Sequence, residues 1–104
     1  MHALCLDNGI RYFGILEPTM VSGRYKMTDL DVELTSNQYN RDYIERYCQF
    51  ISNVLLKINA IPYLYDFTSI FDEQTDCFIE WRHCNEKGNK IVANEVLKVI
   101  LPYL

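Results

Sequence analysis

Two short apolar runs separated by one long amphipathic segment most constrain how this 104-residue chain can fold. Residues 10–16 form a nearly continuous apolar and aromatic run, and residues 61–67 form a second, whose Pro62 can lie only at the start of a strand. Between them, apolar residues recur every three or four positions from a polar cap at residues 35–37 to about Asn59, a pattern typical of an amphipathic helix. The strand–helix–strand order predicts a βαβ unit with parallel strands and a right-handed crossover.

The segments around this unit predict two more helices and two loops. Residues 1–8 suit a short helix that stops at Gly9, and residues 86–101 suit a strongly apolar terminal helix capped by Asn85. Residues 19–34 show no period and predict a long loop. Residues 68–77 are polar, and the apolar pair Ile70 and Phe71 within them predicts a helical turn that packs over the sheet edge.

The predicted sheet is incomplete, because two strands with helices on both faces leave an edge and an apolar flank bare. A helix as short as residues 1–8 is marginal on its own, which favours a helix that begins before Met1. We therefore expect either that the chain is the C-terminal portion of a larger domain or that it pairs with a partner. The candidate partners are a missing N-terminal half and a second copy that meets the chain at its sheet edge.

Composition and cysteine spacing exclude several functional classes. The formal net charge is -4 and the sequence has no basic stripe, so we do not expect nucleic acid as a partner. No apolar stretch approaches the roughly 20 residues that span a bilayer, so we expect no membrane partner and a cytoplasmic location. The four cysteines lack a C-x-x-C spacing, which predicts free thiols. Cys77, His83 and Cys84 lack a fourth ligand, so we expect neither a metal nor another cofactor.

The candidate catalytic residues are Glu80 and His83, in the segment that follows the second predicted strand. A histidine that acts as a general base needs an acceptor for its other ring N–H, and a carboxylate three residues earlier in a turn can reach Nδ1. Ligands of open α/β sheets gather outside the carboxyl ends of the strands, where these residues are expected to lie. Gly88 follows at an early helical position, where glycine is unfavourable unless the helix start presses closely on other backbone. The flanking Trp81 and Arg82 are candidates for a substrate rim, with Trp81 as a cover of the sheet edge the alternative.

Residues 66–71 and 78–93 resemble the C-terminal block of the SGNH (GDSL-type) hydrolases, in which an Asp-x-x-His pair precedes a polar cap, a glycine and a terminal helix. Residues 4–18 are similar to the preceding helix–strand unit of such enzymes. The resemblance implies a flavodoxin-like three-layer α/β/α fold and the hydrolysis of esters, often of acylated carbohydrates or lipids. It also implies that His83 is the catalytic base and Glu80 its orienting acid, with Glu in place of the usual Asp.

The chain lacks the other parts of such an enzyme, because no Gly-Asp-Ser, oxyanion-hole Gly or oxyanion-hole Asn block is present. The available serines suit turn, cap or helix-surface roles instead; they are Ser22, Ser36, Ser52 and Ser69. Cys84 is better explained as an inert thiol than as a nucleophile. The sequence therefore predicts a fragment of an esterase that is inactive alone. The alternative is a non-catalytic α/β interaction module that self-associates or pairs through its exposed sheet edge.

Overall fold

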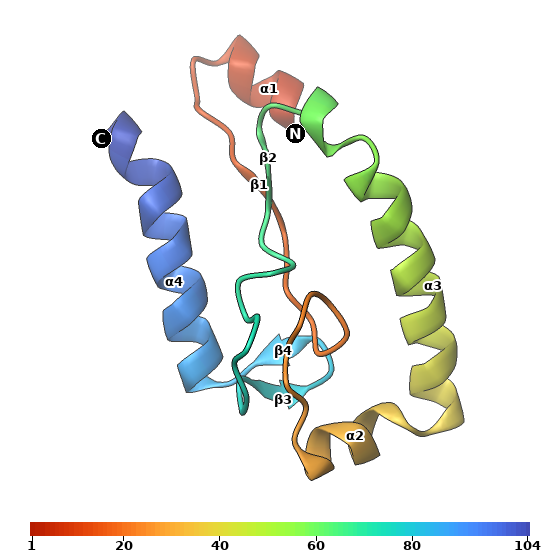
Figure 1. Cartoon of the computed structure of the whole chain (residues 1–104). Coiled ribbons are helices and arrows are strands. Elements are labelled where there is room, and N and C mark those ends of the chain that lie inside the picture. The colour runs from red at the N-terminus through yellow and green to blue at the C-terminus, as the bar shows by residue number, and fades with distance from the viewer.

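The computed structural model describes the backbone of residues 1–104 and every side chain except those of residues 38 and 39. Figure 1 shows α3 and α4 on opposite sides of the extended β1–β2 pair, with the β3–β4 hairpin at its lower end. The chain has a mixed α/β fold. Its elements are α1 (His2–Asp7), β1 (Gly14–Leu16), α2 (Asp29–Thr35), α3 (Gln38–Leu55), η1 (Ile58–Ala60), β2 (Leu64–Asp66), β3 (Phe78–Glu80), β4 (His83–Cys84), α4 (Glu86–Ile100) and η2 (Leu101–Tyr103).

The predicted βαβ unit is confirmed, because β1 and β2 pair in parallel with Gly14 opposite Leu64. Both strands are shorter than the apolar runs that predicted them, since β1 begins at Gly14 and β2 at Leu64. The residues of β1 are half-buried rather than buried on both faces. A sheet of two strands has no further strand to shield its outer edges, so apolar runs that suit a sheet interior remain partly open to water.

Helix α3 begins where its cap predicts, because the Asn37 side chain accepts a hydrogen bond from the backbone N–H of Asn40. It ends at Leu55 rather than near Asn59, and the 3₁₀ turn η1 follows. Of its predicted apolar face, Ile51 is buried, while Ile44 and Tyr47 are half-buried against the core. Tyr43 and Phe50, which were predicted on the same face, are exposed. Tyr39, another member of the predicted apolar face, lies outside the described side chains.

The prediction of one long loop over residues 19–34 is wrong, because α2 forms within it. Thr28 and Asp31 make a reciprocal capping box at its start. Asp31 is buried and accepts a hydrogen bond from the Tyr25 hydroxyl at 2.8 Å, whereas Leu30 and Val32 are exposed. This helix is held by a polar contact rather than by an apolar stripe, which is why it shows no hydrophobic period.

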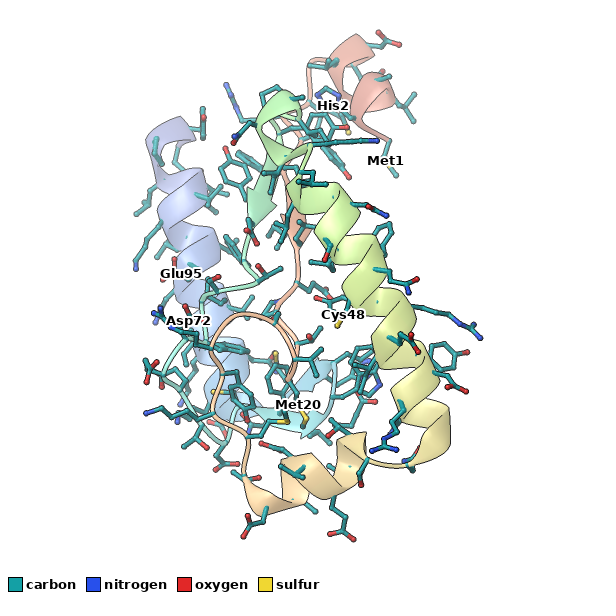
Figure 2. The ribbon with its side chains drawn as sticks, turned by 45° about the vertical axis from the view of Figure 1, so that its right-hand side comes forward. Met1, His2, Met20, Cys48, Asp72 and Glu95 are labelled. Atoms are coloured by element: carbon teal, nitrogen blue, oxygen red, sulfur yellow. The ribbon has the colours of Figure 1, made fainter. Side chains whose placement is uncertain are left out.

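The buried core lies at the lower end of the molecule, around the β3–β4 hairpin and Met20 (Figure 2). Phe71 is 1% exposed, so the apolar insertion predicted to pack in residues 68–77 does contribute to the core. The core members are Met20, Tyr25, Phe71, Cys77, Phe78 and Trp81. Among the described residues, no helix is both long and apolar enough to cross a bilayer.

Candidate functional site

Glu80 and His83 lie on a tight antiparallel hairpin, in which β3 and β4 are joined by Trp81 and Arg82. The prediction that they lie in a loop is wrong, because Glu80 ends β3 and His83 begins β4. Trp81 causes the difference, because its side chain is only 6% exposed and lies edge-on to the Tyr47 ring. A buried turn residue pulls the segment onto the core and folds it back on itself. Trp81 is therefore a core residue and not part of a substrate rim.

The hairpin brings the two candidate catalytic side chains into direct contact. Glu80 and His83 are opposite each other in the strand register, and Glu80 Oε1 lies 2.6 Å from His83 Nδ1. The same oxygen accepts the backbone N–H of Arg82 at 2.9 Å. A carboxylate can only accept at Nδ1, so the contact favours the tautomer that carries its proton on Nδ1 and leaves Nε2 as a free acceptor. Nε2 is the atom that a general base needs.

The surroundings of Glu80 keep it ionised. Partial burial raises the pKa of its carboxyl group, but the hydrogen bonds from the Arg82 backbone and the His83 ring outweigh this and hold the pKa below its ordinary value. The pair is still open to solvent, with the His83 side chain 67% and the Glu80 side chain 39% exposed. An additional segment placed over the hairpin can therefore reach the imidazole.

A cleft of about 270 Å³ lies beside His83, between the carboxyl end of β1 and the first turns of α4. Its polar members Glu17 and Asn89 were not singled out as candidate site residues from the sequence. The position of Glu17 directly after a strand was the signal that could have found it. The cleft is lined by Ile15, Glu17, Pro18, Arg82, His83, Cys84, Asn89 and Val92.

The start of α4 holds the hairpin in place. The Asn85 side chain accepts the backbone N–H of Gly88 at 2.9 Å, which confirms the predicted cap, and the Asn85 backbone N–H donates to the carbonyl of Cys77 at 2.9 Å. A Cβ at Gly88 would overlap that same carbonyl oxygen. The predicted close approach of the helix start to other backbone is therefore confirmed, and it explains the glycine.

Among the described side chains, no serine lines this cleft, so none can act as its nucleophile. The hydroxyl of Ser22 bonds locally to Thr19, and that of Ser36 bonds to the carbonyl of Glu33. Burial raises the pKa of the Cys84 thiol, and Cys77 and Glu17 raise it further, so this thiol stays protonated. The described His, Cys, Asp and Glu side chains also form no group arranged to hold a metal ion.

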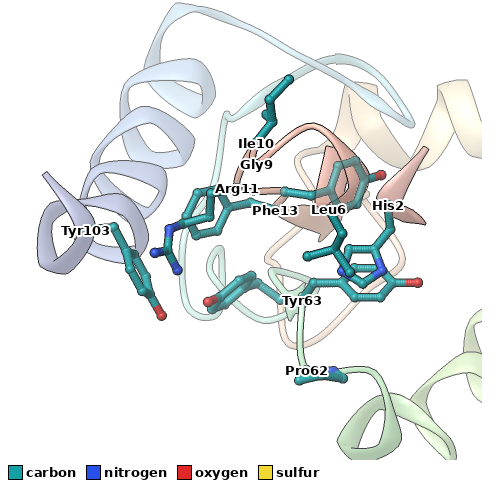
Figure 3. Close-up of a pocket in the computed structure, with 11 residues that line it drawn as sticks. His2, Leu6, Gly9, Ile10, Arg11, Phe13, Pro62, Tyr63 and Tyr103 are labelled. Atoms are coloured by element: carbon teal, nitrogen blue, oxygen red, sulfur yellow. The ribbon is translucent and has the colours of Figure 1, made fainter. Parts of the chain in front are cut away.

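A second cavity, of about 420 Å³, lies at the opposite end of the parallel strands (Figure 3). Its walls are aromatic: the His2 and Tyr63 rings stack with centroids 3.8 Å apart, and the Arg11 guanidinium lies 4.1 Å from the centre of the Tyr103 ring. Tyr12 meets Tyr63 edge-on. These contacts join α1 and η2 to the segments that lead into β1 and β2, so the cluster ties both chain ends to the sheet.

Comparison with known proteins gives no match: no family model, no curated protein and no solved structure is similar to the chain. The resemblance to SGNH hydrolases therefore rests on the pattern of residues 4–18, 66–71 and 78–93 alone.

Proposed function

We propose that this chain supplies the base and the orienting acid of a Ser-His-acid triad in an SGNH-type ester hydrolase. His83 is the base and Glu80 is the acid, and the nucleophilic serine comes from a segment outside this sequence. The observation that carries the proposal is the 2.6 Å contact between Glu80 Oε1 and His83 Nδ1. In the same proposal, the chain is part of a flavodoxin-like three-layer α/β/α fold; the placement of α3 and α4 on opposite sides of β1–β2 supports it (Figure 1).

The proposed mechanism assigns one proton to each step. His83 Nε2 accepts the serine proton while the serine oxygen attacks the ester carbonyl, and the Glu80 carboxylate stabilises the imidazolium that forms. The imidazolium then gives that proton to the departing alcohol, which leaves an acyl-serine. Water then enters and attacks the acyl carbonyl while His83 Nε2 takes a proton from it. The imidazolium returns that proton to the serine oxygen as the carboxylic acid is released, which restores the free serine. The proposed substrates are acylated carbohydrates or lipids, as the resemblance implies. In this proposal the reacting ester enters the cleft beside His83.

The first test addresses the orientation of His83. Long-range ¹H–¹⁵N NMR spectra of the imidazole nitrogens should show His83 with its proton on Nδ1, and Glu80→Gln should shift the ring toward the commoner Nε2-protonated tautomer. His2 is an internal control, because its ring is stacked on the ring of Tyr63. A His83 ring protonated on Nε2 in the unsubstituted chain would remove the basis of the proposal.

The second test addresses the missing nucleophile. The chain alone should hydrolyse p-nitrophenyl acetate no faster than its His83→Ala variant, and a fluorophosphonate probe should label no serine. His2→Ala is the matched control for simple imidazole reactivity. Turnover that is lost in His83→Ala but kept in His2→Ala would show that the nucleophile lies within this chain. In a polypeptide that carries an upstream Gly-Asp-Ser segment in frame, His83→Ala should lower kcat by about 10³-fold or more.

A further inference from the structure

The chain is more open than a folded monomer of its size. Its radius of gyration is 15.3 Å, whereas a compact domain of this length has about 13 Å. Its exposed surface is 7302 Å², whereas a folded monomer of the same mass exposes about 6,100 Å². The excess of roughly 1,200 Å² is larger than the roughly 800 Å² that each partner buries in a standard stable interface. The surface is therefore large enough for a partner to cover.

Strand β1 offers a free edge on which such a partner can pair. The backbone N–H of Gly14 donates to the carbonyl of Tyr63 at 2.7 Å, and the carbonyl of Leu16 accepts the N–H of Phe67 at 3.0 Å. Parallel ladders use alternate residues of a strand, so the N–H and C=O groups of Ile15 are directed away from β2. Unpaired groups of this kind are a template for another strand.

We propose that a second copy of this chain pairs with β1 in an antiparallel manner, with the two-fold axis at Gly14. Ile15 then lies opposite Phe13 of the partner subunit, and the two β1–β2 pairs become one four-stranded sheet. Gly14 then lies opposite Gly14 of the partner subunit in a non-hydrogen-bonded pair, where the two Cα atoms are closest and a residue without a side chain fits best. The axis is perpendicular to the sheet, so the helices of both copies continue the same two outer layers.

Charge complementarity selects this register. With Gly14 on the axis, Glu17 lies opposite Arg11 of the partner subunit, and the symmetry forms this pair twice. Opposite charges in cross-strand pairs are stabilising. A register shifted by two residues in one direction would place Glu17 opposite Phe13 of the partner subunit. A shift by two residues in the other direction would place Arg11 opposite Ile15 of the partner subunit. Only the proposed register lets both charged residues meet a counterion.

The pairing also changes the His83 cleft. Glu17 lines that cleft, so the interface brings Arg11 of the partner subunit to its rim. Each copy thereby adds a cation to the candidate site of the other. The inference does not depend on ester hydrolysis, because its test reads out only mass and affinity.

Sedimentation velocity and light scattering of the whole chain test the proposal over a concentration series. The expected species is a dimer of twice the 12.3 kDa chain mass. Ile15→Pro should convert it to a monomer with an unchanged circular dichroism spectrum, because proline removes an outward N–H that the β1–β2 ladder does not use. A monomer at every concentration, or an open-ended polymer, would overturn the proposal.

Charge reversal tests the register even if the proline variant fails to fold. Arg11→Glu and Glu17→Arg should each weaken the dimer Kd roughly tenfold, since each creates two like-charged pairs. The double variant restores opposite charges and should return the Kd to within about threefold of the unsubstituted value. Arg46→Glu is the matched control, because the Arg46 guanidinium also lies over a tyrosine ring, 5.8 Å from the centre of Tyr43, but far along the sequence from β1. A dimer that both single variants leave intact would show that the register is wrong.

Discussion

Substitution of Gly88 by alanine separates two effects of opposite sign. Gly88 lies in the first turn of α4 and is buried. Helix propensity alone predicts that alanine at this position stabilises the chain by about 1 kcal/mol. The packing predicts the reverse, because the new Cβ would overlap the carbonyl oxygen of Cys77 and approach the Cβ of Cys84 to 3.1 Å.

The steric effect should win. The Cys77 carbonyl cannot move aside freely, since it accepts the Asn85 N–H at 2.9 Å and so joins the hairpin to the helix start. Overpacking of a close contact costs about 1–3 kcal/mol, and loss of the hydrogen bond adds about 1 kcal/mol. After the gain in helix propensity, Gly88→Ala should lower the free energy of unfolding by about 2 kcal/mol.

Urea unfolding followed by the fluorescence of Trp81 measures this directly, because Trp81 is the single tryptophan and lies buried in the hairpin. The midpoint should fall by about 1 M at one fixed protein concentration. Ala93→Gly, at an exposed position of the same helix, calibrates helix propensity and should cost about 1 kcal/mol. A Gly88→Ala variant that is more stable than the unsubstituted chain would refute the close approach of α4 to the hairpin.

Three further substitutions probe contacts around the site. Asn85→Ala should cost about 1 kcal/mol in urea unfolding, because the N–H of Gly88 loses its acceptor. Burial raises the pKa of Tyr25 to about 12. The resulting contribution to the free energy of unfolding is complete below pH 10 and is lost as the pH rises to about 12. Tyr25→Phe should remove this alkaline loss of stability, which is at most about 3 kcal/mol. The pKa of Glu80 is lowered from its ordinary value of 4.5. Ionised Glu80 therefore stabilises the fold above pH 4.5, and this stabilisation is lost as the pH falls below it. Glu80→Gln should flatten this acid dependence of the free energy of unfolding.

Local chemistry predicted the parts of the fold that depend on neighbours in the sequence. A cap was expected at one of residues 35–37 and at Asn85, and the structure has Asn37 and Asn85 in these roles. Such a cap needs only a side-chain oxygen two or three residues before a free backbone N–H. The parallel pairing of β1 with β2 also followed from the order of the elements. The close approach at Gly88 was predicted from the unfavourable placement of a glycine within a helix.

The parts that depend on distant contacts were missed. Helix α2 is held to the core by Asp31, which accepts a hydrogen bond from the Tyr25 hydroxyl. Its sequence therefore shows no hydrophobic period from which the helix could be predicted. The β3–β4 hairpin was hidden because its turn contains Trp81, a residue that is unusual in a two-residue turn and is placed there by burial against Tyr47. In both cases a tertiary contact, and not local propensity, decides the structure.

In the proposed triad, the hairpin lets a glutamate take the place of the aspartate that SGNH hydrolases have. Residues opposite each other across an antiparallel pair hold their Cβ atoms about 5 Å apart and point to the same face. The extra methylene of Glu80 lets one carboxylate oxygen span that gap and reach His83 Nδ1 while it accepts the Arg82 N–H. The two hydrogen bonds fix the carboxylate from different directions, and neither requires the pair to be buried. The carboxylate of Glu80 is therefore positioned by the backbone of its own turn, and in the proposed triad it orients the imidazole before the nucleophile-bearing segment covers the hairpin.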